Sequence, residues 1–68
     1  MSEFTLNGQS RPLPDAPLSI TALIEAEGFA GRRIAVEQNG EIVPKSRHAE
    51  TFIAEGDTLE IVVAVGGG

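Results

Sequence analysis

Cysteine is missing from this chain, and histidine occurs once, as His48. Without cysteine no disulfide can stabilise the fold, and a single histidine offers no Cys/His cluster for a structural metal. With 68 residues the chain is long enough for one domain only, and a domain of this size has a small stability margin. Its stability must come from packed apolar side chains, and the hydrophobic fraction of 41% is ordinary for a folded domain.

Positive charge is also scarce. The formal net charge is -5, and the five basic residues are scattered along the sequence without interleaved aromatic residues. An acidic protein is repelled by nucleic acid and by anionic membrane surfaces, so neither is expected as a partner. The N-terminus has no basic segment followed by an apolar run, and no apolar stretch approaches the roughly 20 residues of a membrane span. These features favour a cytoplasmic protein.

Side chains suited to catalysis are few. His48 lies in a polar stretch and is expected to be a solvated surface residue. Glu25 and Glu27 lie two positions apart on a predicted helix, so their carboxylates do not face each other. Residues 55–57 (Glu-Gly-Asp) lack the ligand spacing of a calcium loop and are expected to form a turn. The residues therefore predict no catalytic group and no metal site, as in a protein that is not an enzyme.

Short segments of strand character alternate with turn signals. The predicted strands cover residues 3–7, 9–13, 33–38, 41–43 and 58–65. Asn7-Gly8 and Asn39-Gly40 separate two pairs of strands and predict tight hairpin turns, because both residue types tolerate positive φ. Pro12 restricts its strand to an edge or an end of the sheet. Residues 45–50 are polar and predict a single turn, after which Phe52 and Ile53 are expected to supply apolar anchors.

One helix is predicted between Ser19 and Gly28. The Ser19 hydroxyl can accept a hydrogen bond from a first-turn N–H, and Gly28 stands where a left-handed C-cap is needed. Phe29 is expected to fold back onto the helix. The apolar residues of the helix fall on one stripe at helical spacing, namely Ile20, Leu23 and Ile24.

The helix stripe and one face of the sheet must bury each other. The sheet residues expected in this core are Phe4, Leu6, Ile34, Val36, Leu59, Ile61 and Val63. One main helix packed on a mixed five-stranded sheet meets this need, so the predicted fold class is α+β, in the β-grasp arrangement. The expected domain covers residues 1–65 and is followed by a flexible glycine tail, 66–68. Val62 and Ala64 should point away from the helix, where they mark a candidate docking surface.

The C-terminal end is the most unusual feature, because a strongly apolar strand runs directly into three glycines. This ending, with residues 39–44 (Asn-Gly-Glu-Ile-Val-Pro), 55–57 and 60–62, resembles the ThiS-type sulfur carrier proteins of thiamine biosynthesis, which are ubiquitin-like. The resemblance covers most of the chain and is strongest over residues 34–68. Ubiquitin and the small subunit of molybdopterin synthase share the diglycine, whereas the hairpin and the acidic turn favour the thiamine branch.

The resemblance implies that the carboxylate of Gly68 carries the chemistry. In this family a ubiquitin-activating-like adenylyltransferase of the ThiF type uses ATP to adenylate that carboxylate, which then becomes a thiocarboxylate. A cysteine desulfurase or another donor supplies the sulfur, and thiazole synthase of the ThiG type receives it. The carrier binds no cofactor, since its partners supply the catalytic groups. Gly67 and Gly66 would let the tail enter a narrow channel, because glycine has no Cβ.

Three other functions stay open at the level of sequence. The small subunit of molybdopterin synthase has the same tail chemistry but a different acceptor. In a ubiquitin-like protein modifier, the tail would end in an isopeptide bond to lysine. A plain interaction module would carry a chemically inert tail.

Overall fold

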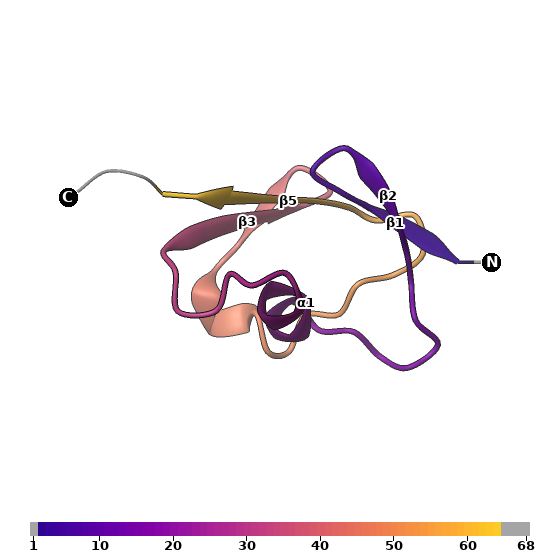
Figure 1. Cartoon of the computed structure of the whole chain (residues 1–68), viewed down its shortest axis with the longest axis horizontal. Helices are drawn as coiled ribbons and strands as arrows, with labels where there is room; N and C mark the ends of the chain where they lie inside the picture. The colour runs from indigo at the N-terminus through magenta and orange to yellow at the C-terminus, as the bar shows by residue number, and fades with distance from the viewer. Residues whose placement is uncertain (1, 65–68) are drawn as a thin grey trace.

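The structure is a computed structural model and describes residues 2–64. One α-helix packs against one face of a five-stranded sheet (Figure 1). The helix is α1 (Ile20–Ala26), and a short 3₁₀ turn, η1 (Lys45–Arg47), follows the second hairpin. The strands are β1 (Glu3–Leu6), β2 (Gln9–Pro12), β3 (Ile34–Gln38), β4 (Glu41–Val43) and β5 (Thr58–Val63). The predicted α+β fold with a β-grasp arrangement is confirmed.

The last strand occupies the centre of the sheet. The strand order is β2-β1-β5-β3-β4, so β5 joins the hairpin β1–β2 to the hairpin β3–β4. It pairs parallel with β1 and antiparallel with β3, which makes the sheet mixed. Strand β2 lies at one edge, as Pro12 required, because an edge strand needs fewer ladder hydrogen bonds. The position of β5 therefore depends on both hairpins.

Both hairpins turn at the predicted Asn-Gly dipeptides. Asn7 and Gly8 have φ of 50° and 82°, and Asn39 and Gly40 have φ of 54° and 85°. Two consecutive residues with positive φ form a type I′ turn, whose twist matches that of the flanking strands. Asparagine and glycine adopt this conformation at the least steric cost. The two Asn-Gly dipeptides therefore fix the registers of the two hairpins.

The helix begins and ends at its predicted caps. The Ser19 hydroxyl accepts a hydrogen bond from the N–H of Ala22 at 3.0 Å. At the other end Gly28 has φ of 82°, its N–H donates to the Glu25 carbonyl, and the Phe29 N–H donates to the Ile24 carbonyl. These two bonds form a Schellman motif. They turn Phe29 back so that it packs against the core, as expected.

The core lies between α1 and the inner face of the sheet. Ile34 and Val63 were predicted to be buried there but are only half-buried, because they pair with each other in the last register of the β3–β5 ladder, where the sheet ends. The remaining predicted core residues are buried, together with Ile53; the full set is Phe4, Leu6, Ile20, Leu23, Ile24, Val36, Ile53, Leu59 and Ile61.

Phe52 is not the apolar anchor that the sequence suggested. Its side chain is 53% exposed, whereas Ile53 is buried. Phe52 forms an isolated bridge with Ser19, so the backbone is extended at this point. Neighbouring side chains of extended backbone point to opposite sides. Burying Ile53 therefore turns Phe52 outward.

His48 also departs from expectation, because it is buried rather than solvated. Its carbonyl accepts a hydrogen bond from the N–H of Thr21 in α1, and its Nε2 donates to the Val43 carbonyl at 3.0 Å. These contacts hold the residue between the helix and the end of β4. The sequence around His48 is polar, so nothing local to it signals burial. Val43 is only five residues away, but Thr21 belongs to the distant helix α1, and only the fold brings it to His48.

Asp57 connects the turn before β5 to the second hairpin. Its carboxylate accepts hydrogen bonds from the Asn39 Nδ2 at 3.0 Å, the Gln38 Nε2 at 2.9 Å and the Ala54 N–H at 2.8 Å. Desolvation favours the neutral acid, but the hydrogen bonds from Asn39, Ala54 and Gln38 outweigh it and lower the pKa of Asp57. The turn at residues 55–57 was predicted, whereas this role of Asp57 was not.

Replacing Asp57 should lower stability in a pH-dependent way. We expect Asp57→Ala to reduce the free energy of unfolding by about 1–3 kcal/mol at pH 7, because several polar groups lose their acceptor. A lowered folded-state pKa adds stability above the unfolded pKa, which is lost as the pH falls through the folded value. The difference from the wild type should therefore shrink below about pH 4. Urea unfolding at several pH values measures it.

The matched control is Asp15→Ala, which removes an exposed carboxylate that makes no side-chain hydrogen bond among residues 2–64. It should leave stability nearly unchanged at each pH. An Asp57→Ala variant as stable as the wild type at pH 7 would contradict the assignment, and so would a loss that stays constant with pH.

Candidate functional site

The predicted site residues Gly66, Gly67 and Gly68 lie outside the described residues, as does Val65 at the predicted end of the last strand. The structure does describe the base from which they follow. The N–H of Ala64 donates to the Arg33 carbonyl at 2.9 Å, one step beyond the pairing of Ile34 with Val63. The chain is therefore tied to β3 up to Ala64. The described strand β5 ends at Val63, two residues before the predicted end.

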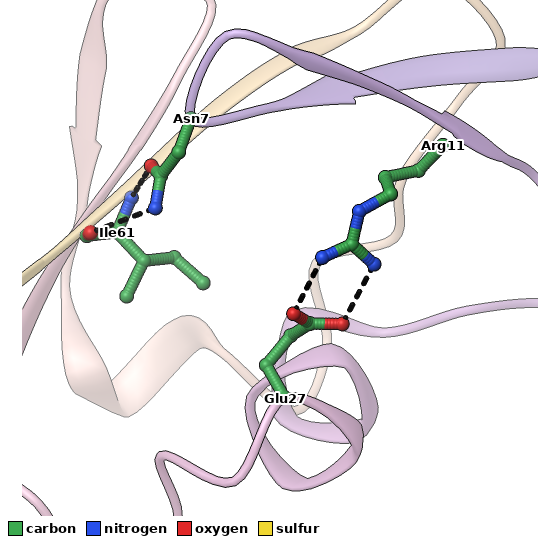
Figure 2. Close-up of polar contacts among 4 residues, drawn as sticks. All are labelled: Asn7, Arg11, Glu27 and Ile61. Atoms are coloured by element: carbon green, nitrogen blue, oxygen red, sulfur yellow. Dashed lines mark hydrogen bonds and ion pairs between the residues drawn. The ribbon is translucent and has the colours of Figure 1, made fainter.

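A side chain strengthens the hold on β5. The Ile61 N–H donates to the Asn7 Oδ1 at 2.8 Å, and the Asn7 Nδ2 donates to the Ile61 carbonyl at 3.3 Å (Figure 2). The Asn7 amide thus takes the place of a backbone peptide, at the point where β1 has ended in its turn. We call this pair of bonds the Asn7 clamp. It fixes the middle of β5 against the first hairpin, and sequence reasoning assigned Asn7 only to the turn.

Val62 and Ala64 point away from the helix, as predicted. Val62 is 60% exposed, and Ala64 is exposed as well. Val62 pairs with Ala35 on β3, so small apolar groups lie together on the outer face near the end of β5. Further from that end, Glu60 pairs directly with Glu37. The outer face therefore has an apolar end and an acidic middle. The opposed glutamates in the middle repel each other and destabilise the sheet locally.

An ion pair braces the far edge of the sheet. Arg11 on β2 donates from both terminal nitrogens to the two carboxylate oxygens of Glu27, at 2.9 Å and 2.7 Å (Figure 2). The hydrogen bonds from Arg11 lower the pKa of Glu27 below its ordinary value. This pair holds the edge strand to the C-terminal end of α1. Sequence reasoning missed it, since nothing in the local sequence marks two residues this far apart as partners.

A search of residues 2–64 finds no group of three or more His, Cys, Asp or Glu side chains placed to hold a metal ion. In the same part of the chain, no helix has the length and apolar character needed to cross a membrane. The described part of the candidate site is a scaffold in which the central strand β5 is held on both sides and ends shortly before the glycine segment.

The class of protein follows from this arrangement. A single helix on a mixed five-stranded sheet, with the last strand in the centre, defines a ubiquitin-like β-grasp domain. The chain belongs to the ThiS family, whose sequence model matches residues 4–68. The match includes all three C-terminal glycines.

Solved and curated relatives agree with this assignment. The crystal structure of the thiamine biosynthesis protein ThiS from Geobacter metallireducens superposes with a TM-score of 0.81 at 31% identity, covering 97% of this chain and 99% of that one. Thiazole synthase of Paramagnetospirillum magneticum is 42% identical over 66 residues, which are 97% of this chain and 20% of that protein. Thiazole synthase of Magnetococcus marinus is 32% identical over 63 residues, 93% of this chain and 19% of that protein.

The chain therefore spans about a fifth of the length of the thiazole synthases that it matches. The ThiS structure, in contrast, matches it over nearly its whole length. The family match, the ThiS structure and the thiazole synthase relatives agree with a sulfur carrier of thiamine biosynthesis. The resemblance inferred from the sequence is confirmed.

Proposed function

We propose that this chain is a protein co-substrate that carries sulfur on the carboxylate of Gly68 for formation of the thiazole of thiamine. The observation that carries the proposal is the ThiS-family match through residue 68, because it includes the glycine segment and not only the folded domain. The scaffold suits this role, since the chain is held from Thr58 to Ala64, through β5 and the bond from Ala64 to Arg33, shortly before that segment. We place the protein in the cytoplasm.

The proposed chemistry has two steps. An α-carboxyl group with a pKa of about 3.5 is ionised at neutral pH, so its oxygen can attack the α-phosphate of ATP and release pyrophosphate. The acyl adenylate makes the carbonyl carbon electrophilic. Hydrosulfide from the donor then forms a bond to that carbon, and AMP leaves with one of the carboxylate oxygens. Where the donor is a persulfide, a thiol reduces the S–S bond of the acyl disulfide that forms and leaves one sulfur on the carbon. The carboxylate has exchanged one oxygen for sulfur, and the domain itself contributes no catalytic side chain.

The partners follow from this chemistry. An adenylyltransferase of the ThiF type would supply the ATP site, and a cysteine desulfurase or another donor would supply the sulfur. A thiazole synthase of the ThiG type would be the acceptor. The thiazole synthase relatives support this last partner, because each contains a segment similar to this chain. No cofactor is assigned to the chain itself.

The test is conversion of the full chain with ATP, the adenylyltransferase and a sulfur source. We expect intact-mass analysis to show one oxygen replaced by one sulfur, and fragmentation to place the change on Gly68. The mass of the protein isolated from its natural cell tells whether Gly68 bears the free carboxylate there. Isopeptide conjugates without thiocarboxylate would indicate the modifier function. An unchanged tail with verified active partners would refute the proposal, and transfer of the sulfur to a molybdopterin precursor instead of thiazole would change the acceptor.

The outer face near the end of β5 is the proposed docking surface for the adenylyltransferase. We expect Val62→Asp to weaken its binding by about tenfold or more, since a carboxylate would be buried in an apolar contact. Ile42→Asp is the matched control, because Ile42 is 72% exposed on the edge strand β4, two strands away from β5. Binding is measured by titration calorimetry. An unchanged affinity of Val62→Asp, with normal folding by circular dichroism, would remove Val62 and Ala64 from the docking surface.

A further inference from the structure

A groove on the helix side of the domain is not used by the proposed tail chemistry. It has a volume of about 510 Å³ and lies between α1, the segment that joins α1 to β3, and η1. Ile24, Phe29 and Ile34 supply apolar lining, and all three belong to the core or pack against it. The buried His48 lines the groove from the η1 side. We call this feature the basic groove, for the residues described next.

Positive charge gathers at the groove although the protein is acidic. The net charge is -5, yet three of the five basic residues line the groove and are exposed: Arg32, Arg33 and Lys45. The other two, Arg11 and Arg47, pair with Glu27 and Glu50. Within residues 2–64 the three groove cations form no ion pair. Glu25 is the carboxylate among the lining residues.

The backbone fixes the positions of two of these cations. Gly31 has φ of 81°, and the N–H of Arg32 donates to the Phe29 carbonyl at 3.0 Å, so the chain turns tightly at this point. The Arg33 carbonyl then accepts the N–H of Ala64. The backbone of Arg32 and Arg33 is thereby held between the apolar lining and the end of β5. A charged side chain on a backbone held by the fold loses less backbone entropy on binding than one on a free loop.

The groove opens beside the base of the glycine segment. In Figure 1 the segment between α1 and β3 lies at the end of the molecule toward which β5 runs. The pairing of Ile34 with Val63, followed by the bond from Ala64 to Arg33, places the groove wall and the end of β5 side by side. An enzyme that accepts the chain after Ala64 must therefore cover surface next to the groove.

We propose that the basic groove is a second docking site, for an acidic segment of the enzyme that receives the tail. An apolar side chain of that segment would contact Ile24, Phe29 and Ile34, and its carboxylates would pair with Arg32, Arg33 and Lys45. Charge complementarity selects this occupant, because the groove is positive on a protein whose outer sheet face carries Glu37 and Glu60. The identity of the enzyme rests on the proposed function, whereas the chemistry of the groove does not.

The first test uses the full chain alone. Two short synthetic peptides are titrated into the ¹⁵N-labelled protein: one of glutamates around a central leucine, and its counterpart with glutamine in place of glutamate. We expect the acidic peptide to shift the amide resonances of Phe29–Ile34 and His48, and the neutral peptide to shift them weakly. Inorganic phosphate and added sodium chloride are the ionic controls. Equal shifts with phosphate would indicate a simple anion site and overturn the proposal.

The matched variants lie two residues apart in η1. Lys45→Glu and Arg47→Glu make the same change of charge, but only Lys45 lines the groove. We expect Lys45→Glu to lower the affinity for the acidic peptide by about tenfold, and Arg47→Glu to leave that affinity little changed. Arg32→Glu should behave as Lys45→Glu. Equal losses in Lys45→Glu and Arg47→Glu, or no binding of the acidic peptide to the wild type, would overturn the proposal.

The second test uses the adenylyltransferase and the thiazole synthase with the same variants. Lys45→Glu should raise the KM for the carrier with at least one of them, with kcat retained, and Arg47→Glu should not. If both enzymes treat the two variants alike, the groove is not a docking site for either, and the proposal fails while tail conversion stands. If the wild-type tail is not converted at all, the proposed function fails, and the peptide titration still decides whether the groove binds an acidic segment.

Discussion

Adding one residue after Gly68, or removing Gly67 and Gly68, is expected to abolish thiocarboxylate formation completely. The added residue displaces the reactive carboxylate from the position that the adenylyltransferase must reach, and the deletion shortens the segment that enters its active site. Both variants should stay folded, because neither change touches the buried core of residues 4–61. Intact-mass analysis after incubation with ATP, enzyme and a sulfur source measures the loss, and circular dichroism reports the fold.

The matched control adds the same residue before Met1, at the other end of the chain. This variant should be converted as well as the wild type, because its C-terminal carboxylate is unchanged. Full conversion of the C-terminally extended variant would show that the reactive group is not the carboxylate of Gly68. Loss of folding in the deletion variant would show that the glycines support the domain rather than present a reactive group.

The second large effect concerns stability. Leu23→Ala should reduce the free energy of unfolding by about 2–5 kcal/mol, because it removes buried methyl groups and leaves a cavity in the core. Leu23 is buried in the same core as Ile20 and Ile61, so the change acts on the contact between α1 and the sheet. In a small domain this is a large share of the total stability. Urea unfolding followed by circular dichroism measures this loss of free energy.

Val62→Ala serves as the exposed comparison, because Val62 lies on the outer face and is 60% exposed. Its effect should stay within about 0.5 kcal/mol, apart from a small loss of strand propensity. A Leu23→Ala loss near that of Val62→Ala would mean that the helix stripe does not face the sheet in solution. A loss of cooperativity instead of a shift in midpoint would show that α1 is needed to define one packed state.

Local signals explain how much of the fold the sequence predicts. The two Asn-Gly turns, the Ser19 and Gly28 caps and the apolar stripe of α1 each depend on residues within a few positions of one another. Such features can be recognised from spacing alone. The fold class then follows, because one stripe and one sheet face have few ways to bury each other.

The burial of His48 and the polar contacts that the sequence did not predict depend on the tertiary fold. His48 is bonded to Thr21 of the distant helix α1 as well as to Val43, and Asp57 acquires two of its three partners from the second hairpin. The pairing of Arg11 with Glu27 likewise joins two separate elements. None of the long-range partnerships has a signal in the local sequence. The basic groove belongs to the same group, since basic residues that look scattered in the sequence meet only after α1, β3 and η1 have packed.

The candidate site was predicted on other grounds. Val62 and Ala64 were placed correctly by the alternation of strand side chains, which is a local rule. Gly68 was assigned through a family resemblance, because a terminal carboxylate has no pattern of its own that distinguishes a reactive group from a plain chain end. The family match extends through residue 68, and the role of Gly68 stays a prediction. Under the proposed function the catalytic groups belong to partner enzymes, so the carrier would need no catalytic motif of its own.

The Asn7 clamp bears on how the domain responds to mechanical load. The β3–β5 ladder has five registered pairs, and the clamp ties Ile61 to the first hairpin on the opposite side. A pull on the chain beyond Ala64 acts along β5, so it stresses these bonds together in shear instead of peeling them apart one by one. Under the proposed function, an enzyme that draws the following residues into its active site would load the β3–β5 pairs and the Asn7 clamp together, so we expect the domain to resist unravelling from this end.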